Sequence, residues 1–346
     1  MSVPFLKALV ATSLASVAIA ADGEWKRLAD IPDAEGFAGS FAGVVAGQFV
    51  VAGGANFPER KPWEGGAKVW HDRIFVLAQA AGAWREAGRL PRPLGYGLSI
   101  TTPTGLLCIG GSDAEAHHAE TFELRLEGDS LRVVPMPDLP VTLANMCGAL
   151  VGRTVWVAGG QETPASTVAL ARTWTLDLDR RHDGWKEIEA WPGRGRILAV
   201  AGAVGDAFVI AGGADLEAAA DGRATRAWLR DAWACEAAAV AGRRWRRIAD
   251  LPRAAVAAPG PLPLDEKGRP LLLGGDDGTQ AGVAPGDHRG FPRDVLAWDP
   301  ATDAWVAAGG VAEGLVTTPA VIWGDAIVVP GGEIRPGIRS NHVWRR

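Results

Sequence analysis

Two side chains near the C-terminus have the types and the spacing for acid–base chemistry. The segment Val328–Trp344 reads VVPGGEIRPGIRSNHVW, in which Glu333 directly follows a glycine doublet and Arg339 stands six residues further on. Pro336 and Gly337 between them favour a tight turn that would bring the two side chains together. A carboxylate held beside a cation can take and return a proton. The plainer interpretation is a salt bridge within an ordinary loop.

The fold that would position this pair is predicted by a repeat. An apolar run ending in Gly-Gly occurs six times, at Gly53-Gly54, Gly110-Gly111, Gly159-Gly160, Gly212-Gly213, Gly274-Gly275 and Gly331-Gly332. Adjacent doublets lie about 50 to 60 residues apart, the period of kelch repeats. Each doublet is followed by a loop, a strand rich in aromatic and β-branched residues, and a strand that usually begins with Trp. Four strands in each of six repeats predict an all-β, six-bladed kelch-type β-propeller over residues 21–346.

The two ends of the chain complement each other. Residues 24–32 read EWKRLADIP, which is a Trp-containing outer strand without the three strands that should precede it. The last repeat stops after its third strand, NHVWRR. We therefore expect the N-terminal strand to close the ring on the C-terminal blade, which leaves no open sheet edge.

The loops that follow the doublets should emerge on one face of such a propeller, where a central pocket collects side chains from all blades. The first of these loops, ANFPERKPWEGGAKVWHD, contains Asn56 and Arg60, and Arg196 follows a proline at a blade boundary. Arginine binds carboxylates through two parallel hydrogen bonds, and amide and aromatic groups suit a polyol. The sequence thus predicts a small-molecule site at this face.

Residues 1–20 are predicted to be a separate segment. Lys7 precedes an apolar stretch, Ala8–Ala20, that ends in the small-residue pattern Ala18-Ile19-Ala20. This is the pattern of a cleaved signal peptide, and the stretch is too short to span a bilayer comfortably. We expect export, cleavage near Ala21 and no membrane attachment afterwards.

Charge and cysteine content exclude other classes. The net charge is −5 and the basic residues are dispersed, so no basic stripe is present to bind nucleic acid. Cys108, Cys147 and Cys235 form no CxxC pair, which argues against a metal or thioredoxin-type site. Because Cys108 and Cys147 stand in apolar runs, burial as small hydrophobic residues is favoured over a disulfide.

Two stretches resemble a known family. GGANFPERKPWEGG with VWHDRIFVL in the first loop, and GGEIRPGIRSNHVW at the C-terminal end, resemble the kelch-like sialic acid mutarotases, also called N-acetylneuraminate epimerases. The resemblance covers essentially all of residues 21–346, but the order is rotated. In better-known members the Gly-Glu-x5-Arg loop lies mid-chain, whereas here it is C-terminal. This arrangement resembles a cyclically permuted branch of the family, and a closed ring tolerates such a change.

The resemblance implies a function and a set of site residues. The reaction would be interconversion of the α and β anomers of N-acetylneuraminate by ring opening and closure, without metal or organic cofactor, in the periplasm. Glu333 would be the catalytic base and acid. Arg339 would hold the carboxylate of the sugar acid and favour ionised Glu333. Arg196, Asn56 and Arg60 would orient the substrate.

One departure and three alternatives accompany this interpretation. The family's Arg-x-Tyr-Gly motif reads Leu94-Gly95-Tyr96-Gly97 here, which leaves the exact sugar open. A copper oxidase with kelch blades needs two tyrosines, and Tyr96 is the only tyrosine in the chain. A non-catalytic carbohydrate-binding kelch propeller would use the same face and the same arginines. A scaffold for protein partners fits less well with a charged, Trp-containing mouth.

Overall fold

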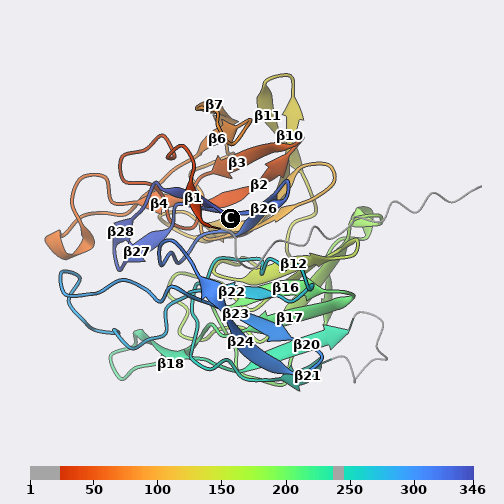
Figure 1. The fold of residues 1–346 in the computed structure, drawn as a ribbon, viewed down its shortest axis with the longest axis vertical. Coiled ribbons are helices and arrows are strands. Elements are labelled where there is room, and N and C mark those ends of the chain that lie inside the picture. Colours follow the sequence, from red (N-terminus) through yellow and green to blue (C-terminus); the bar gives the residue numbers. More distant parts are fainter. Residues whose placement is uncertain (1–23, 237–244) are drawn as a thin grey trace, which may run out of the picture.

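Six sheets surround a central axis in the computed structural model, which describes residues 24–236 and 245–346. Within these ranges every regular element is a β-strand or one of two 3₁₀ turns, η1 (Pro62–Glu64) and η2 (Arg181–Asp183). Figure 1 shows the first blade at the top and the fourth at the bottom of the molecule. The expected signal peptide lies outside the described residues. No helix in the described part is long and apolar enough to cross a bilayer.

The first four blades are four-stranded antiparallel sheets that follow the chain. Their strands, given from the axis outwards, are β2 (Phe41–Val45), β3 (Gln48–Ala52), β6 (Arg73–Leu77) and β7 (Trp84–Arg89); β8 (Leu98–Thr101), β9 (Leu106–Ser112), β10 (His117–Glu127) and β11 (Ser130–Pro135); β12 (Cys147–Val151), β13 (Thr154–Ala158), β14 (Thr173–Asp177) and β15 (Lys186–Ile188); and β16 (Val200–Val204), β17 (Ala207–Ala211), β20 (Ala232–Glu236) and β21 (Trp245–Ile248). The second strand of each is almost wholly buried, because both of its faces pack against neighbouring blades.

The fifth blade differs from the expected four strands. Its described strands are β22 (Leu271–Leu273), β23 (Asp294–Asp299) and β24 (Ala304–Gly310). The inner position is taken by an irregular segment that contains Pro259, Pro261 and Pro263. Proline has no N–H to donate to a ladder, so this segment makes only isolated bridges, for example between Leu264 and Pro270.

The last blade closes the ring as predicted. It contains β25 (Val321–Trp323), β26 (Ala326–Pro330) and β29 (Val343–Arg345), and its outermost strand is β1 (Lys26–Arg27) from the other end of the chain. Lys26 pairs with Arg345 and Arg27 with Trp344.

Tryptophans of the outer strands link neighbouring blades. In five blades a Trp indole N–H donates to a carbonyl at the end of the outer strand of the preceding blade or just beyond it, at 2.7–2.9 Å. The five residues are Trp25, Trp84, Trp185, Trp245 and Trp305. These repeated residues are therefore part of the blade packing, as the repeat pattern indicated. The cysteines are buried as well, and burial raises the pKa of Cys147 to about 12.

Three extra hairpins stand on one face, at the left of Figure 1. They are β4–β5 (Ala55–Asn56 and Val69–Trp70), β18–β19 (Ala214–Ala218 and Ala224–Trp228) and β27–β28 (Glu333–Arg335 and Ile338–Arg339). Each follows a glycine doublet, so the doublet loops share a face as predicted.

The residue that leads into each inner strand takes part in a ring of hydrogen bonds around the axis. Each of these six residues donates its backbone N–H to the carbonyl of the preceding member, at 2.7–2.9 Å. Each also has a positive φ, between 53° and 68°. The members are Gly39, Tyr96, Asn145, Leu198, Ala257 and Thr317. The last link, from Gly39 back to Thr317, closes the ring.

The doublets require glycine for two separate reasons. Gly159 and Gly160 have φ values of +68° and +95°, a region in which a Cβ is unfavourable. A Cβ on Gly159 would also lie 2.4 Å from the carbonyl oxygen of Arg196, and the N–H of Gly160 donates to that same carbonyl at 2.8 Å. The doublets therefore join one blade to the segment that enters the next.

Gly159→Ala should destabilise the protein more than Gly205→Ala. Gly205, in the turn between β16 and β17, also has a positive φ (+56°) but has no atom within 4 Å of its Cβ position. The left-handed conformation alone should cost about 1 kcal/mol at Gly205, and the clash should add about 2 kcal/mol at Gly159. Urea unfolding of the two variants measures the difference, and equal losses would contradict the packing role of the doublet.

Candidate functional site

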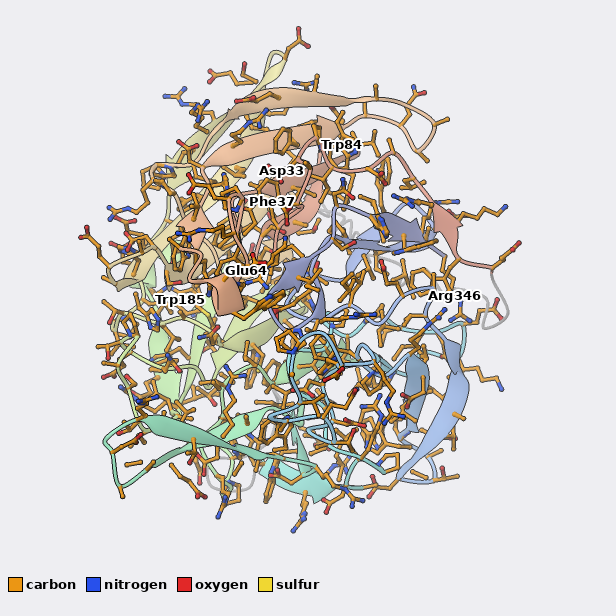
Figure 2. All side chains as sticks on the ribbon, turned by 90° about the vertical axis from the view of Figure 1, so that its left-hand side faces the viewer. Asp33, Phe37, Glu64, Trp84, Trp185 and Arg346 are labelled. Atoms are coloured by element: carbon orange, nitrogen blue, oxygen red, sulfur yellow. The ribbon has the colours of Figure 1, made fainter. Side chains whose placement is uncertain are left out.

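A cavity of about 520 Å³ lies at the axis, on the face that carries the extra hairpins. Figure 2 views this face, with the blades arranged around the centre. Five of the six members of the hydrogen-bonded ring line the cavity, namely Tyr96, Asn145, Leu198, Ala257 and Thr317. Its walls come from the doublet loops, including both strands of β27–β28. A volume of this size is within the usual range for small-molecule sites.

Glu333 and Arg339 meet in the wall of this cavity. They are opposite each other across β27–β28, and Arg339 Nη1 lies 2.7 Å from Glu333 Oε1. The turn at Pro336 and Gly337 also places the N–H of Gly337 on Glu333 Oε1, at 2.5 Å. The predicted turn thus brings the pair together and fixes the carboxylate from two sides.

Arg339 lines the cavity, and most of its side chain is engaged by protein groups. Its residue is 7% exposed, and its guanidinium lies 5.0 Å from the centre of the Phe57 ring. Nε donates to the carbonyl of Ala55 at 3.3 Å, and Nη2 donates to the hydroxyl of Tyr96 at 3.5 Å. The Nη1 contact with Glu333 is close but is not aligned as a hydrogen bond, so Nη1 has no hydrogen-bond acceptor among the described residues.

Asn56 supports the site from behind. Its side chain is buried, its amide N–H groups donate to Asp33 Oδ1 and to the carbonyl of Gly36, both at 3.1 Å, and its Oδ1 accepts from His71 Nε2 at 2.8 Å. Burial lowers the pKa of His71 below its usual value. Asn56 therefore ties the first loop to the segment before β2, and it is not among the residues that line the cavity.

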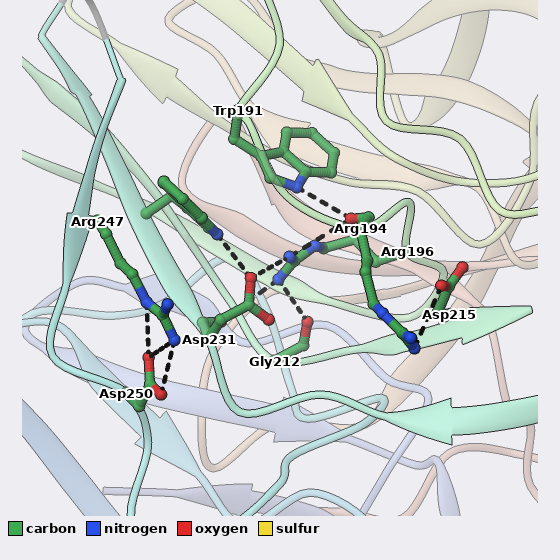
Figure 3. Close-up of polar contacts among 9 residues, drawn as sticks. Trp191, Arg194, Arg196, Gly212, Asp215, Asp231, Arg247 and Asp250 are labelled. Atoms are coloured by element: carbon green, nitrogen blue, oxygen red, sulfur yellow. Dashed lines mark hydrogen bonds and ion pairs between the residues drawn. The ribbon is translucent and has the colours of Figure 1, made fainter.

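Arg60 and Arg196 are also placed away from the cavity lining. Arg60 is exposed on the first loop. Arg196 is completely buried, at 0% exposure. Its Nη1 donates to the carbonyl of Gly212 at 2.9 Å, and its Nη2 lies 2.6 Å from Asp231 Oδ2 (Figure 3). The structure thus brings together Glu333 and Arg339, but not the three residues expected to orient the substrate.

The Arg196–Asp231 pair is a buried ion pair with further support. Trp233 Nε1 donates to Asp231 Oδ2 at 2.6 Å, and the Arg196 guanidinium lies 5.1 Å from the centre of the Trp191 ring. Burial alone would raise the pKa of Asp231, but Arg196 and Trp233 outweigh it and hold this pKa below its usual value. The pair joins the segment entering the fourth blade to the start of β20.

Several residues of the cavity were not predicted as site residues from the sequence. Lys68 and Trp70 form one part of the wall together with Tyr96, which the sequence analysis named only as part of a motif, and His117 forms another part. His117 Nδ1–H donates to the carbonyl of Gln161 at 3.0 Å, and burial lowers its pKa, so the ring is neutral at pH 7. The one available signal was that most of these residues stand in doublet loops. Among the described residues no group of three or more His, Cys, Asp or Glu side chains is arranged to hold a metal.

Comparison with a solved structure agrees with the fold. The solved structure of YjhT superposes with a TM-score of 0.64 over 91% of this chain and 95% of that chain, at 14% identity. At this identity the likeness shows the fold alone, and it confirms the six-bladed kelch-type propeller.

The sequence comparisons carry the family resemblance. The profile of the N-acetylneuraminate epimerase family matches residues 6–133. The N-acetylneuraminate epimerase of Brucella suis is 35% identical over 125 residues, 32% of each chain. That of Yersinia pestis (strain Pestoides F) is 39% identical over 105 residues, 25% of this chain and 26% of its own. The resemblance is thus confirmed, although the chain spans about a third or less of the length of these relatives. Glu333 and Arg339 lie beyond the profile match.

Arg196→Met should reduce stability without changing the affinity of the cavity for a ligand. Removing one partner of a buried ion pair leaves the other charge uncompensated, which costs about 3–5 kcal/mol. Arg194→Met is the matched control, because Arg194 makes exposed ion pairs with Asp215 and Glu217 worth at most about 1 kcal/mol. Thermal unfolding compares the two variants. An unchanged stability together with weaker ligand binding would restore Arg196 to the substrate site.

Acidification should remove the contribution of Asp231. Because its pKa is lowered in the folded protein, its stabilisation is present above the unfolded pKa of about 3.9 and is lost as the pH falls through the lower folded value. The excess in unfolding free energy of the wild type over Asp231→Asn should therefore shrink below about pH 4. Urea unfolding of both proteins at several pH values tests this, and a constant excess would argue against it.

Proposed function

We propose that the protein interconverts the α and β anomers of N-acetylneuraminate. The observation that carries the proposal is the Glu333–Arg339 pair, held at 2.7 Å in the wall of an axial cavity of about 520 Å³. The sequence similarity of the first third of the chain to N-acetylneuraminate epimerases supports it independently.

The chemistry requires one proton to leave and one to arrive. The anomeric hydroxyl gives its proton to the Glu333 carboxylate while the ring oxygen gains a proton, and the bond between the anomeric carbon and the ring oxygen breaks. The open keto form rotates about the bond next to the carbonyl and closes on its other face, with the protons returned. A carboxylate working with one water can perform both transfers.

The surroundings of Glu333 suit this role. The Gly337 N–H and the Arg339 guanidinium both contact Oε1, which leaves Oε2 as the oxygen for proton transfer. A carboxylate fixed in this way loses little orientational freedom when the substrate binds. Because the cyclic hemiketal already opens slowly in water, the protein has only a modest acceleration to supply.

The proposed place of action is the periplasm. This rests on the apolar stretch Ala8–Ala20 with its Ala18-Ile19-Ala20 ending, which is the pattern of a cleaved export signal. A sugar acid is the proposed partner, with no metal or organic cofactor needed for the proton transfers.

Proton NMR of freshly released α-N-acetylneuraminate tests the function. The β-anomer signals should appear faster with the wild type, and Glu333→Gln should lower the rate by about 10²-fold or to the spontaneous value. Glu162→Gln is the control, because Glu162 stands in another doublet loop but outside the cavity lining, and it should keep the wild-type rate.

Two results would contradict the proposal in different ways. An active Glu333→Gln variant would remove Glu333 from the chemistry. A wild type that broadens the sugar signals without accelerating the exchange would be a carbohydrate-binding propeller, and the Glu333–Arg339 pair would then be a structural salt bridge.

A further inference from the structure

The cavity is lined by equal numbers of carboxylates and cations, but the protein does not pair them all with one another. Three carboxylates line it, those of Asp113, Asp276 and Glu333. Each accepts a hydrogen bond or ion pair from a side chain, His118 for Asp113 at 2.7 Å, Trp228 for Asp276 at 3.1 Å and Arg339 for Glu333 at 2.7 Å. Backbone N–H groups of Ala116, Gly278 and Gly337 add a second donor to each. Each of the three carboxylates is thus already paired through at least one of its oxygens.

The cations of the cavity wall are only partly paired by the protein. Arg339, Lys68 and Arg226 line the cavity. Arg339 is paired with Glu333, whereas within residues 24–236 and 245–346 neither Lys68 nor Arg226 has a carboxylate at ion-pair distance. The cavity therefore offers the positive charge of Lys68 and Arg226 to an anionic ligand.

Lys68 is held in place by two aromatic rings. Its Nζ lies 5.2 Å from the centre of the Trp70 ring and 4.8 Å from that of Tyr96. The two rings are 6.3 Å apart and inclined by 65°. Cation–π attraction of this kind orients an ammonium and partly desolvates it without neutralising its charge. Lys68 is half-buried, while Arg226 is exposed on β19.

The side chains around Lys68 connect it to the Glu333–Arg339 pair. Arg339 Nη1 and Trp70 Nε1 are buried and make no hydrogen bond to a described residue. Both atoms are shielded from solvent, so the cation that this part of the wall offers to a ligand is Lys68. Tyr96 connects the two positions, since its ring faces Lys68 and its hydroxyl accepts from Arg339 Nη2 at 3.5 Å.

We propose that Lys68, clamped between Trp70 and Tyr96, binds the carboxylate of the sugar acid. This reassigns the role expected for Arg339, because that residue is only 7% exposed. Its guanidinium is engaged with Glu333, Ala55 and Tyr96. Arg339 is instead a positioning residue for Glu333. The identity of the ligand as N-acetylneuraminate rests on the proposed function, but the carboxylate subsite rests on the cavity alone.

The subsite predicts a preference for an anionic ligand that depends on one side chain. The wild type should bind N-acetylneuraminate more tightly than its methyl ester, which keeps the sugar and replaces the carboxylate by a neutral group one methyl larger. Lys68→Met keeps the aliphatic stem against the two rings and removes the ammonium. We expect it to weaken binding of the acid by about 10- to 100-fold and to leave binding of the ester unchanged, so that the preference disappears. Lys68→Arg should restore most of it.

Arg226→Gln is the matched control, because it removes a second cation of the same cavity. Equilibrium dissociation constants for acid and ester, measured by titration calorimetry on the four proteins after thermal unfolding has shown them to be folded, give the comparison. Arg226→Gln should change the acid-to-ester ratio by less than about 3-fold. A wild-type ratio in Lys68→Met, or a ratio lost in Arg226→Gln instead, would overturn the assignment.

Binding and anomer exchange separate this proposal from the proposed function. If the wild type shows the preference, Lys68→Met loses it and no exchange is accelerated, the subsite stands and the mutarotase function fails. If exchange is accelerated but Lys68→Met keeps the preference, the subsite fails and the function stands. Binding of neither acid nor ester by the wild type would overturn both.

Discussion

The ring of six backbone hydrogen bonds around the axis is the constraint on which the remaining structure depends. Each member has a left-handed backbone conformation, and its carbonyl accepts a hydrogen bond from the member in the next blade. Five of the six members are not glycine. A left-handed conformation at a non-glycine residue costs about 1 kcal/mol or more. The cost is accepted at five positions because the ring fixes the inner ends of all six blades relative to one another.

The same ring gives the cavity a rigid floor. Its members are single residues from six repeats, so the floor has the same backbone geometry below every doublet loop, and the loops differ in side chains rather than in position. This is how Tyr96 comes to contact both Arg339 and Lys68 although it is 243 residues from the former. The chemistry of the site is therefore assembled from loops whose sequence separation says nothing about their distance.

How well a feature could be predicted from the sequence depends on how far apart its interacting residues are along the chain. The doublets, the Trp strands and the missing outer strand of the last repeat are local patterns, and they were sufficient for the blades, their number and the closure by β1. The Glu333–Arg339 pair was predictable because a short turn joins its members. The irregular inner segment of the fifth blade was signalled by Pro259, Pro261 and Pro263 but was counted as a strand, because the period of the other repeats suggested one.

The partners that lie far apart in the chain were not predictable. Arg196 resembled a ligand-binding arginine because it follows a blade boundary, and its partner Asp231 is 35 residues away. Nothing in the sequence distinguishes Lys68 from an ordinary solvated lysine, since only the structure places Trp70 and Tyr96 around it. In both cases the side-chain type was visible in the sequence, but whether its charge is neutralised by the protein or left for a ligand is a property of the packed loops.

The closure of the ring also explains why the position of the Glu333 loop along the chain is of little consequence for the site. Glu333 reaches the cavity because it follows a glycine doublet, and its hairpin β27–β28 forms part of the cavity wall. The same loop on any other blade would occupy an equivalent place around the axis. The strand β1 completes the last blade from the opposite end of the sequence, so no blade is structurally first. A relative with the same blades in another order would keep the distances among Lys68, Tyr96, Glu333 and Arg339, which depend on neighbourhood around the axis. Sequence similarity that covers one stretch of the chain is therefore compatible with a fold shared over 91% of it.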